Sequence, residues 1–309
     1  MFDCEIFDAA RQEFLAHLRY TRGHSPRTCY SYHSDLGIWA AWLAEAGKDW
    51  QRVKAQDVEQ FAAWQLREKG AGAHIVARRL SCLSTFYRWA KKHEIVVDDP
   101  VYLADKPKRP QRIPVWLEKE EQAHLEAAVR RVDDLPENIF GQRREHLRTI
   151  RQRYEMLFGL LLNSGLRISE ALGLKGRDVR LRDGAALAVR VIGKGDKERL
   201  VPLPDKFGQV FGFWLKSQPA EDYVFAQKPK GKPPGAHAAR AYLRRLKDKA
   251  QIAKPITPHK LRHTYATNLL NAGAELVDIQ ALLGHVNLAT TQIYTHVDQD
   301  RMAAVVNKL

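Results

Sequence analysis

Residues 257–296, TPHKLRHTYATNLLNAGAELVDIQALLGHVNLATTQIYTH, predict short helices that are joined by tight turns. Thr257 can cap the start of a helix, and Pro258 suits its first position because the N–H group that proline lacks would be unpaired there. Gly273 and Gly284 are typical of residues that end helices. We therefore expect one helix before Gly273, a second between the two glycines, and a third, shorter one after them.

The same stretch carries side chains that suit a phosphate diester. His259 and Arg262 are one helical turn apart and share a face. Arginine presents a fixed fork of donors to phosphate oxygens, histidine can transfer a proton near neutral pH, and tyrosine can form a covalent intermediate. His285 follows Gly284, and Tyr294 falls in the third expected helix. Each residue also has a purely structural alternative: a solvated His–Arg face, a capping histidine, and a core tyrosine.

A metal site is a second interpretation of this stretch. His259 and His263 have the spacing of two ligands on one helix face. However, the string HKLRH lacks the glutamate of an HExxH zinc hydrolase, and Arg262 would repel a metal cation. We therefore expect neither a metal nor another cofactor.

Length and composition favour a globular protein with an anionic partner. A chain of 309 residues can form two domains with cores, and its 45% hydrophobic and 28% charged residues are ordinary for a globular protein. The net charge of +14 favours nucleic acid as a partner, with a generally basic protein as the alternative. Cys4, Cys29 and Cys82 fit neither a disulfide framework nor a zinc site, so a reducing cytoplasm is expected. No apolar run approaches membrane-spanning length, and no leader is visible.

Residues 1–99 predict a small all-helical domain. Apolar side chains at helical spacing indicate four helices, over residues 5–20, 26–46, 57–69 and 73–93. In the first of these we expect Ile6 to point inward. Exposed basic residues, Arg78 and Arg79 among them, would form either a DNA-gripping face or a merely solvated surface.

Residues 100–114 predict a semi-extended, basic linker. The string ADKPKRPQRIP carries three prolines and the basic residues Lys106, Lys108, Arg109 and Arg112. Such a linker suits two domains that close around a duplex, and it also suits an ordinary tether.

Residues 115–309 predict a second domain. A helix is expected from Leu117 to Arg131, then a loop with an amphipathic segment over residues 132–152, then a buried helix over residues 154–162. Arg167 follows soon after the predicted end of this helix, and its charge needs either a buried carboxylate, such as Glu170, or an anionic ligand.

Two strands and a basic helix are expected next. Residues 186–192 and 198–203 alternate as strands of a hairpin with Lys194 at its tip, where the lysine either is idle or reaches a phosphate. The loop at 226–238 and the helix at 239–249 are basic, and both suit contacts to a nucleic-acid backbone.

Five motifs occur in order along this second domain. They read GLRISEALGL (Arg167), VIGKGDKERLVPL (Lys194), HKLRHTYAT (His259, Arg262), LLGH (His285) and IYTHV (Tyr294). Together they resemble the tyrosine recombinase, or phage-type integrase, family and especially its Xer-like members, over nearly the whole chain. The resemblance implies a mainly α (α+β) fold: a helical core-binding, SAM-like domain at 1–99, the linker at 100–114, and a mixed α/β catalytic domain with a small antiparallel sheet at 115–309.

The resemblance also implies a site-specific DNA recombinase that works through a 3′-phosphotyrosyl intermediate without ATP or metal. Tyr294 would be the nucleophile, Arg167 and Arg262 would clamp the phosphate, Lys194 would protonate the leaving oxygen, His259 would help to deprotonate the tyrosine, and His285 would hydrogen-bond the phosphate. Further DNA contacts are expected from Arg78, Arg79, Lys108, Arg109, Arg240, Arg244 and Arg245. The expected partner is double-stranded DNA with inverted half-sites, bound by a homotetramer, or by a heterotetramer with a related recombinase. The expected location is the cytoplasm, at the nucleoid, with no membrane.

Two other functions compete with this interpretation. A type IB topoisomerase uses similar catalytic groups, although the separate helical domain and the segment after Tyr294 argue against it. A non-catalytic DNA-binding relative is disfavoured because all six candidate residues are present. Segment 132–152 is longer than in compact Xer-like proteins, so both a mobile-element integrase and a chromosomal resolvase remain open. In the family, a tail such as DQDRMAAVVNKL docks on a neighbouring protomer; the alternative is that it packs on its own domain.

Overall fold

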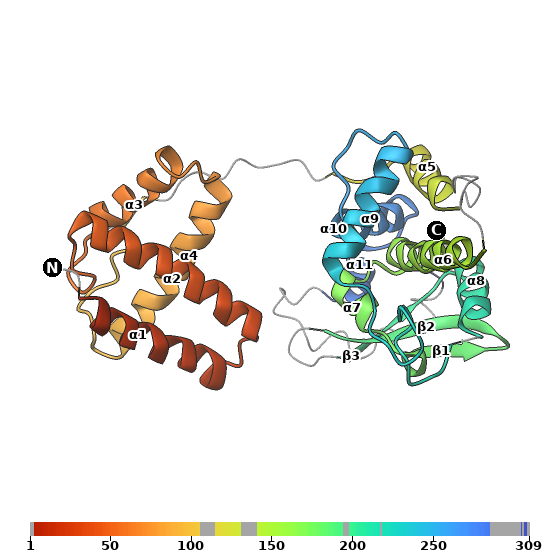
Figure 1. Cartoon of the computed structure of the whole chain (residues 1–309), viewed down its shortest axis with the longest axis horizontal. Helices are drawn as coiled ribbons and strands as arrows, with labels where there is room; N and C mark the ends of the chain where they lie inside the picture. Colours follow the sequence, from red (N-terminus) through yellow and green to blue (C-terminus); the bar gives the residue numbers. More distant parts are fainter. Residues whose placement is uncertain are drawn as a thin grey trace. The chain divides into compact units, whose positions relative to one another are not determined.

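The computed structural model of the chain describes residues 3–105, 115–130, 141–193, 198–216 and 218–284, together with residues 304, 306 and 307. The chain divides into two compact units, Met1–Arg112 and Ile113–Leu309 (Figure 1). Each unit has a hydrophobic core of its own. Among the described residues, no helix combines the length and the apolar character needed to cross a membrane.

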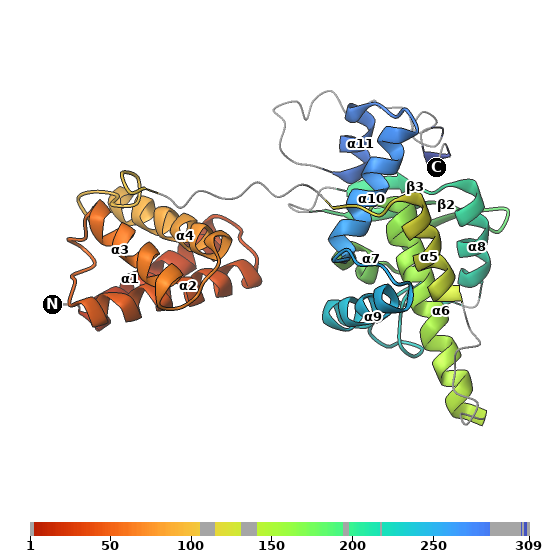
Figure 2. The same ribbon diagram turned by 90° about the horizontal axis from the view of Figure 1, so that it is seen from above.

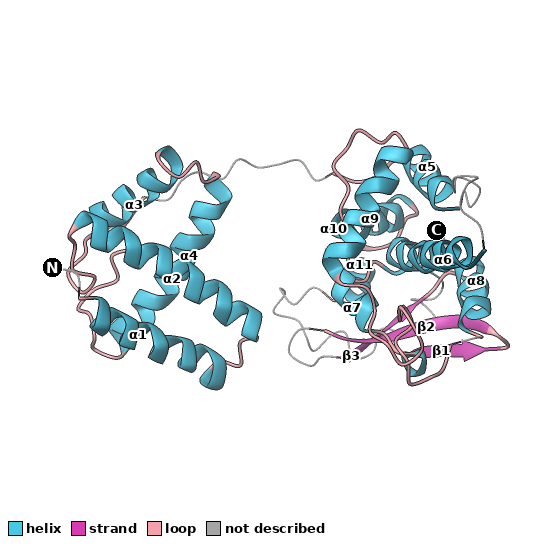
Figure 3. Cartoon of the chain, in the orientation of Figure 1, coloured by secondary structure: helices cyan, strands magenta, loops and turns pink. Residues whose placement is uncertain are grey.

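The first unit is built from helices (Figure 3). They are α1 (Cys4–Ala16), which continues as a π-helical turn over His17–Thr21, α2 (Pro26–Ala46), α3 (Ala55–Arg67) and α4 (Ala73–Lys92). Local chemistry sets the ends of α2. The Ser25 hydroxyl accepts a hydrogen bond from the Thr28 N–H at 3.2 Å, and Gly47 ends the helix with a φ of +64°.

The core of the first unit is rich in aromatic side chains whose polar atoms bond to one another. The Trp39 indole N–H donates to the Tyr87 hydroxyl at 3.2 Å, and that hydroxyl donates to the Trp50 carbonyl at 2.9 Å. The expectation for Ile6 is wrong, because Ile6 is 51% exposed and Phe7 is buried instead. Steps of four residues drift around a helix that has about 3.6 residues per turn, so a row that includes Leu18 leaves the inward face by residue 6.

This core continues past the four helices. Val101 and Ala104 are buried in it, although the sequence placed them in the linker. Residues 106–114 of that predicted linker, with Lys108 and Arg109, lie outside the described residues.

The second unit combines helices with a small sheet, as the sequence predicted. Its elements are α5 (Lys119–Arg130), α6 (Gly141–Ser164), α7 (Ile168–Gly173), a 3-10 turn (Gly176–Asp178), β1 (Val179–Arg182), β2 (Ala185–Ile192), β3 (Glu198–Pro202), α8 (Asp205–Leu215), α9 (Ala236–Lys249), α10 (Pro258–Asn271) and α11 (Leu276–Leu283). The strands are antiparallel in the order β1-β2-β3, with Val189 of β2 opposite Val179 and Val201. The mainly α fold with a small antiparallel sheet is therefore confirmed.

One strand and one α-helix of this unit were not predicted, β1 and α8. Two glycines bring α8 against the sheet, since a Cβ on Gly208 would lie 2.3 Å from the Ala186 carbonyl oxygen and a Cβ on Gly212 would lie 2.2 Å from the Gly184 carbonyl oxygen. The sheet thus has α8 packed directly on its central strand.

Helix α6 contacts α5, α7, α8 and α10, and it is seen end-on among them in Figure 1. It begins at Gly141, so residues 141–152, which the sequence assigned to a loop with an amphipathic segment, are the first half of one continuous helix. Figure 2 shows the N-terminal end of α6 extending beyond its neighbours. Residues 131–140 lie outside the described residues.

Candidate active site

Three of the six predicted catalytic residues belong to the described part of the chain, and the structure brings them together. Arg167 lies between the end of α6 and the start of α7, and His259 and Arg262 are in α10, beside α6 and α11 (Figure 2). Lys194, His285 and Tyr294 lie outside the described residues.

Arg262 is held by backbone atoms of two neighbouring segments. Its side chain is almost fully buried, and its two terminal nitrogens donate to the Gly165 carbonyl at 2.8 Å and to the Leu283 carbonyl at 2.5 Å. Burial, together with the charge of Arg167, lowers the pKa of Arg262 to about 10. The guanidinium therefore stays positive at neutral pH, in a fixed position between the end of α6 and the end of α11.

Gly165 makes this close approach possible. Its φ is +60°, and a Cβ there would lie 2.4 Å from the Tyr265 ring and 2.8 Å from a Leu283 methyl carbon. Only glycine fits such a turn without strain. The turn places the Gly165 carbonyl on Arg262 and lets the chain continue directly into Arg167.

Arg167 has the carboxylate partner that the sequence offered as one of two alternatives. Its Nη1 donates to Glu170 Oε1 at 2.8 Å, and its backbone N–H donates to Glu170 Oε2 at 2.8 Å. The side chain of Glu170 is 7% exposed, whereas that of Arg167 is 41% exposed. Arg167 is therefore held in place by Glu170, and the exposed part of its side chain can still bind an anion from solvent.

Arg199, in β3, is a site residue that the sequence analysis missed. It donates to both carboxylate oxygens of Glu170, at 2.9 and 3.2 Å, and its Nε donates to the Leu282 carbonyl at 3.3 Å. One signal was available. Residues 199 and 201 of an alternating strand share a face, and Val201 is buried, so an arginine at 199 requires an acidic partner.

The pKa of Glu170 reflects this arrangement. Burial alone would raise it, but hydrogen bonds from Arg199 and from the backbone N–H of Arg167 hold it below its ordinary value. Glu170 is therefore a carboxylate at neutral pH, shared between two guanidiniums.

His259 supplies a group that can accept a proton. It is exposed on α10, and its ring centroid lies 4.6 Å from that of His263, with the two rings nearly perpendicular. Partial burial lowers the pKa of His259, and so do the positive charges of His263, Arg262 and Arg167. His259 is therefore neutral at pH 7 and can act as a base there.

The described part of the site carries an excess of positive charge. Arg167, Arg199 and Arg262 bring three guanidiniums, and Glu170 brings one carboxylate, which leaves two positive charges. Fixed donors in a partly buried site stabilise charge that develops on a reacting phosphate. This is the chemistry for which the arrangement is suited.

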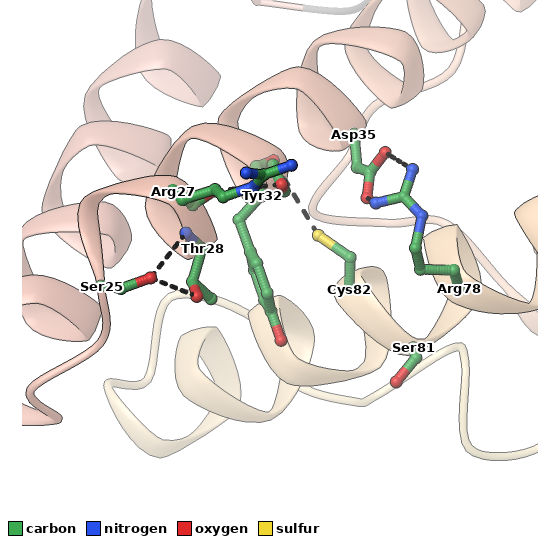
Figure 4. A pocket seen from close by; sticks show the side chains of 9 residues that line it. Ser25, Arg27, Thr28, Tyr32, Asp35, Arg78, Ser81 and Cys82 are labelled. Carbon is green, nitrogen blue, oxygen red and sulfur yellow. Dashed lines mark hydrogen bonds and ion pairs between the residues drawn. The ribbon is translucent and has the colours of Figure 1, made fainter. Parts of the chain in front are cut away.

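Two of the predicted DNA contacts, Arg78 and Arg79, lie in the described part of the first unit, and their surroundings differ; Figure 4 shows Arg78. Arg78 faces Asp35 and bonds both of its oxygens, one of them at 2.7 Å, with 53% of its side chain exposed. It lines a cleft of about 350 Å³ together with Arg27 and several hydroxyl side chains. Arg79 is 18% exposed and donates to Gln65 at 2.7 Å. Arg79 is thus engaged inside the unit, whereas Arg78 reaches solvent.

The basic residues of α9 were expected at its surface. Arg240, Arg244 and Arg245 are all exposed there. The helix begins at Ala236, directly after Gly235, which is three residues before the predicted start.

Comparison with known proteins gives the same family for both units. Residues 137–301 match the model of the Phage integrase family, and residues 12–94 match that of the Phage integrase N-terminal SAM-like domain. "Tyrosine recombinase XerD" of Proteus mirabilis is 36% identical, over 96% of this chain and 90% of the relative. "Tyrosine recombinase XerC" of Pseudomonas syringae pv. syringae is 33% identical, over 94% of this chain and 92% of the relative.

Solved structures share the fold. The XerH site-specific recombinase bound to palindromic difH substrate gives a TM-score of 0.68 at 21% identity, over 95% of this chain and 83% of that one. A lambda integrase dimer bound to a COC′ core site gives a TM-score of 0.67 at 16% identity, over 90% of this chain and 94% of that one.

Proposed function

The chain belongs to the phage integrase family of tyrosine recombinases, enzymes that cleave and rejoin DNA at specific sites, and we propose that Tyr294 is its nucleophile. The observation that carries this proposal is the gathering of Arg167, Arg262 and His259 where α6, α7, α10 and α11 meet. Two positive charges in excess and a neutral imidazole suit a transesterification at phosphorus.

In the proposed reaction the Tyr294 oxygen bonds to phosphorus while the bond from phosphorus to the 5′-oxygen breaks. The phosphate becomes a 3′-phosphotyrosyl ester, and a 5′-hydroxyl is released. Attack by the 5′-hydroxyl of a second strand reverses the step. Each ester bond is exchanged for another, so the reaction consumes no ATP and needs no metal.

Each candidate residue then has a role. Arg167 and Arg262 bind the non-bridging oxygens, Lys194 protonates the leaving 5′-oxygen, His259 accepts the tyrosine proton, and His285 donates a hydrogen bond to the phosphate. The positions of Arg167, Arg262 and His259 support their roles. The roles of Lys194, His285 and Tyr294 rest on the family motifs that these residues match.

We further propose that a tetramer, of this chain alone or with a related recombinase, acts on double-stranded DNA with inverted half-sites at the nucleoid. The related XerH structure is bound to a palindromic substrate, and a lambda integrase tetramer is bound to a Holliday junction. The helical domain at 1–99 would grip DNA, with Arg78 as a contact, the basic linker at 100–114 would carry Lys108 and Arg109, and α9 of the catalytic domain at 115–309 would present Arg240, Arg244 and Arg245. Arg79 would support this surface from inside.

The test uses a nicked suicide duplex, in which the cleaved strand loses a short fragment and cannot be rejoined. The native chain should form a covalent protein–DNA adduct, whereas Tyr294→Phe should bind the same DNA with unchanged affinity and form none. An adduct that persists in Tyr294→Phe would refute the assignment. Relaxation of any supercoiled plasmid without site preference would favour a type IB topoisomerase instead.

A further inference from the structure

Arg199 has been assigned no bond to the DNA or to a reacting atom, yet every nitrogen of its guanidinium is engaged at the site. Nη1 and Nη2 donate to Glu170 at 3.2 and 2.9 Å, and Nε donates to the Leu282 carbonyl at 3.3 Å. Its side chain is 14% exposed. An arginine with all its nitrogens bonded and little exposure is held in one orientation, and it fixes its partners in turn.

One of those partners leads to Arg167. Glu170 accepts two hydrogen bonds from Arg199 and two from Arg167, one of them from the Arg167 backbone. Without Arg199, this nearly buried carboxylate would keep only half of its donors and would either turn toward solvent or bind a proton. In both cases Arg167 loses the anchor that sets its direction.

The other partner is the end of α11. Arg199 bonds the Leu282 carbonyl and Arg262 bonds the Leu283 carbonyl, so two guanidiniums cap the negative end of one short helix. A Cβ on Gly284 would lie 3.2 Å from the side chain of Arg199, which shows how closely the guanidinium lies against this residue. His285 is the next residue in the sequence.

We propose that Arg199 is a positioning residue for strand cleavage: through Glu170 it orients Arg167, and through the Leu282 carbonyl it holds the end of α11, which Arg262 also bonds. The inference rests on the proposed function. Because Arg199 acts on groups that bind the phosphate rather than on DNA directly, its loss should slow cleavage and leave DNA affinity nearly unchanged.

The experiment compares Arg199→Met, Arg199→Lys and a matched control in the full chain. The control is Arg190→Met in the neighbouring strand β2, since Arg190 also pairs with two carboxylates but is 44% exposed. Two quantities are measured for each variant: the single-turnover rate of adduct formation on saturating nicked DNA, and the dissociation constant for the same duplex without the nick.

We expect Arg199→Met to form the adduct about 10- to 100-fold more slowly, because small displacements of catalytic groups cost rates of that order. Its dissociation constant should stay within about twofold of the native value, and Arg190→Met should match the native chain in both quantities. Arg199→Lys should fall between, since an ammonium keeps the charge but lacks the fork that reaches Glu170 and Leu282 together. Equal adduct rates in Arg199→Met and the native chain would overturn the proposal, as would a loss confined to affinity.

A double-variant cycle tests the route through Glu170. Glu170→Gln combined with Arg199→Met should be no slower than the slower single variant, because both changes break one connection. If the fold-losses of the two single variants multiply in the double variant, Arg199 acts independently of Glu170, and the proposal is overturned. Arg199→Lys with Glu170→Gln gives the same cycle should Arg199→Met fail to fold. If the native chain itself forms no adduct, the proposed function fails rather than this inference.

Discussion

Each unit of the chain contains a buried carboxylate shared by two arginines, and the two clusters differ in what surrounds them. In the first unit Asp35, whose side chain is 3% exposed, lies between Arg78 and Arg79 and joins α2 to α4. In the second unit Glu170 joins Arg167 to Arg199. One carboxylate and two guanidiniums leave one excess positive charge in either cluster.

The second cluster has two additions. Arg262 brings the excess to two positive charges, and His259 places a neutral base beside them. An arginine that is paired with a carboxylate can connect two helices and contact a DNA backbone. Chemistry at phosphorus requires positive charge that no carboxylate neutralises, together with a group that can accept a proton.

The largest expected effect comes from removing this additional arginine. Arg262→Gln should slow adduct formation about 100- to 1000-fold on saturating DNA, as is usual when one donor to a developing charge is lost. Arg79→Gln, the matched change in the first unit, should leave the adduct rate unchanged, since Arg79 bonds within its own unit. Single-turnover rates on nicked DNA measure both. An equal loss of adduct rate in Arg262→Gln and Arg79→Gln would contradict the proposed difference between the two clusters.

The first cluster should matter more for stability than for chemistry. Asp35→Ala leaves Arg78 and Arg79 without their carboxylate and should lower the free energy of unfolding of the first unit by about 2 kcal/mol, less than for a fully buried pair because Arg78 is 53% exposed. Urea denaturation followed by tryptophan fluorescence reports on this unit, whose core holds Trp39 and Trp50. An Asp35→Ala variant of unchanged stability whose adduct rate falls sharply would contradict the expectation that the first cluster serves stability more than chemistry.

A smaller effect concerns two histidine pairs, one in each unit. Partial burial and His263 both lower the pKa of His259, so the rate of adduct formation should fall only when the pH drops below the ordinary histidine value of 6.5. In His263→Asn a neighbouring positive charge is gone, the pKa of His259 rises, and the acid limb of the pH–rate profile should move to higher pH.

The matched control for this profile is His93→Asn. His93 lies 6.0 Å from His17, between ring centroids, and it likewise contributes to lowering the pKa of His17 after the larger effect of burial. Its removal should leave the pH–rate profile in place. A shift of the profile in His93→Asn, or no shift in His263→Asn, would show that the acid limb does not report the protonation of His259.

Sequence reasoning was most accurate where the cause is local. Thr257 before Pro258 and the left-handed Gly284 set helix ends through atoms only a few residues away, and the structure has both. Glu170 was offered as a partner of Arg167 because the two are three residues apart. Arg199 escaped prediction because its partners, Glu170 and Leu282, are 29 and 83 residues away in the sequence.

The same distinction explains the errors in the fold. The inward face of α1 depends on which residues meet α2 and α4, so Phe7 rather than Ile6 is buried. Strand β1 has only four residues, VRLR, and although apolar and basic residues alternate in it, three of the four are exposed, so no buried face marks it as a strand. Residues 141–152 were assigned to a loop with an amphipathic segment, whereas they are the first half of α6, which begins at Gly141.

The most direct measurement identifies the residue that becomes attached to DNA. The native chain is incubated with the nicked suicide duplex, the adduct is digested with protease and nuclease, and mass spectrometry locates the modified residue. We predict a single 3′-linked nucleotide on Tyr294, its absence from Tyr294→Phe, and a much smaller amount of it at the same early time point when Arg262 is replaced by glutamine. Attachment to any other residue, or no attachment under conditions in which the chain binds the duplex, would contradict the account.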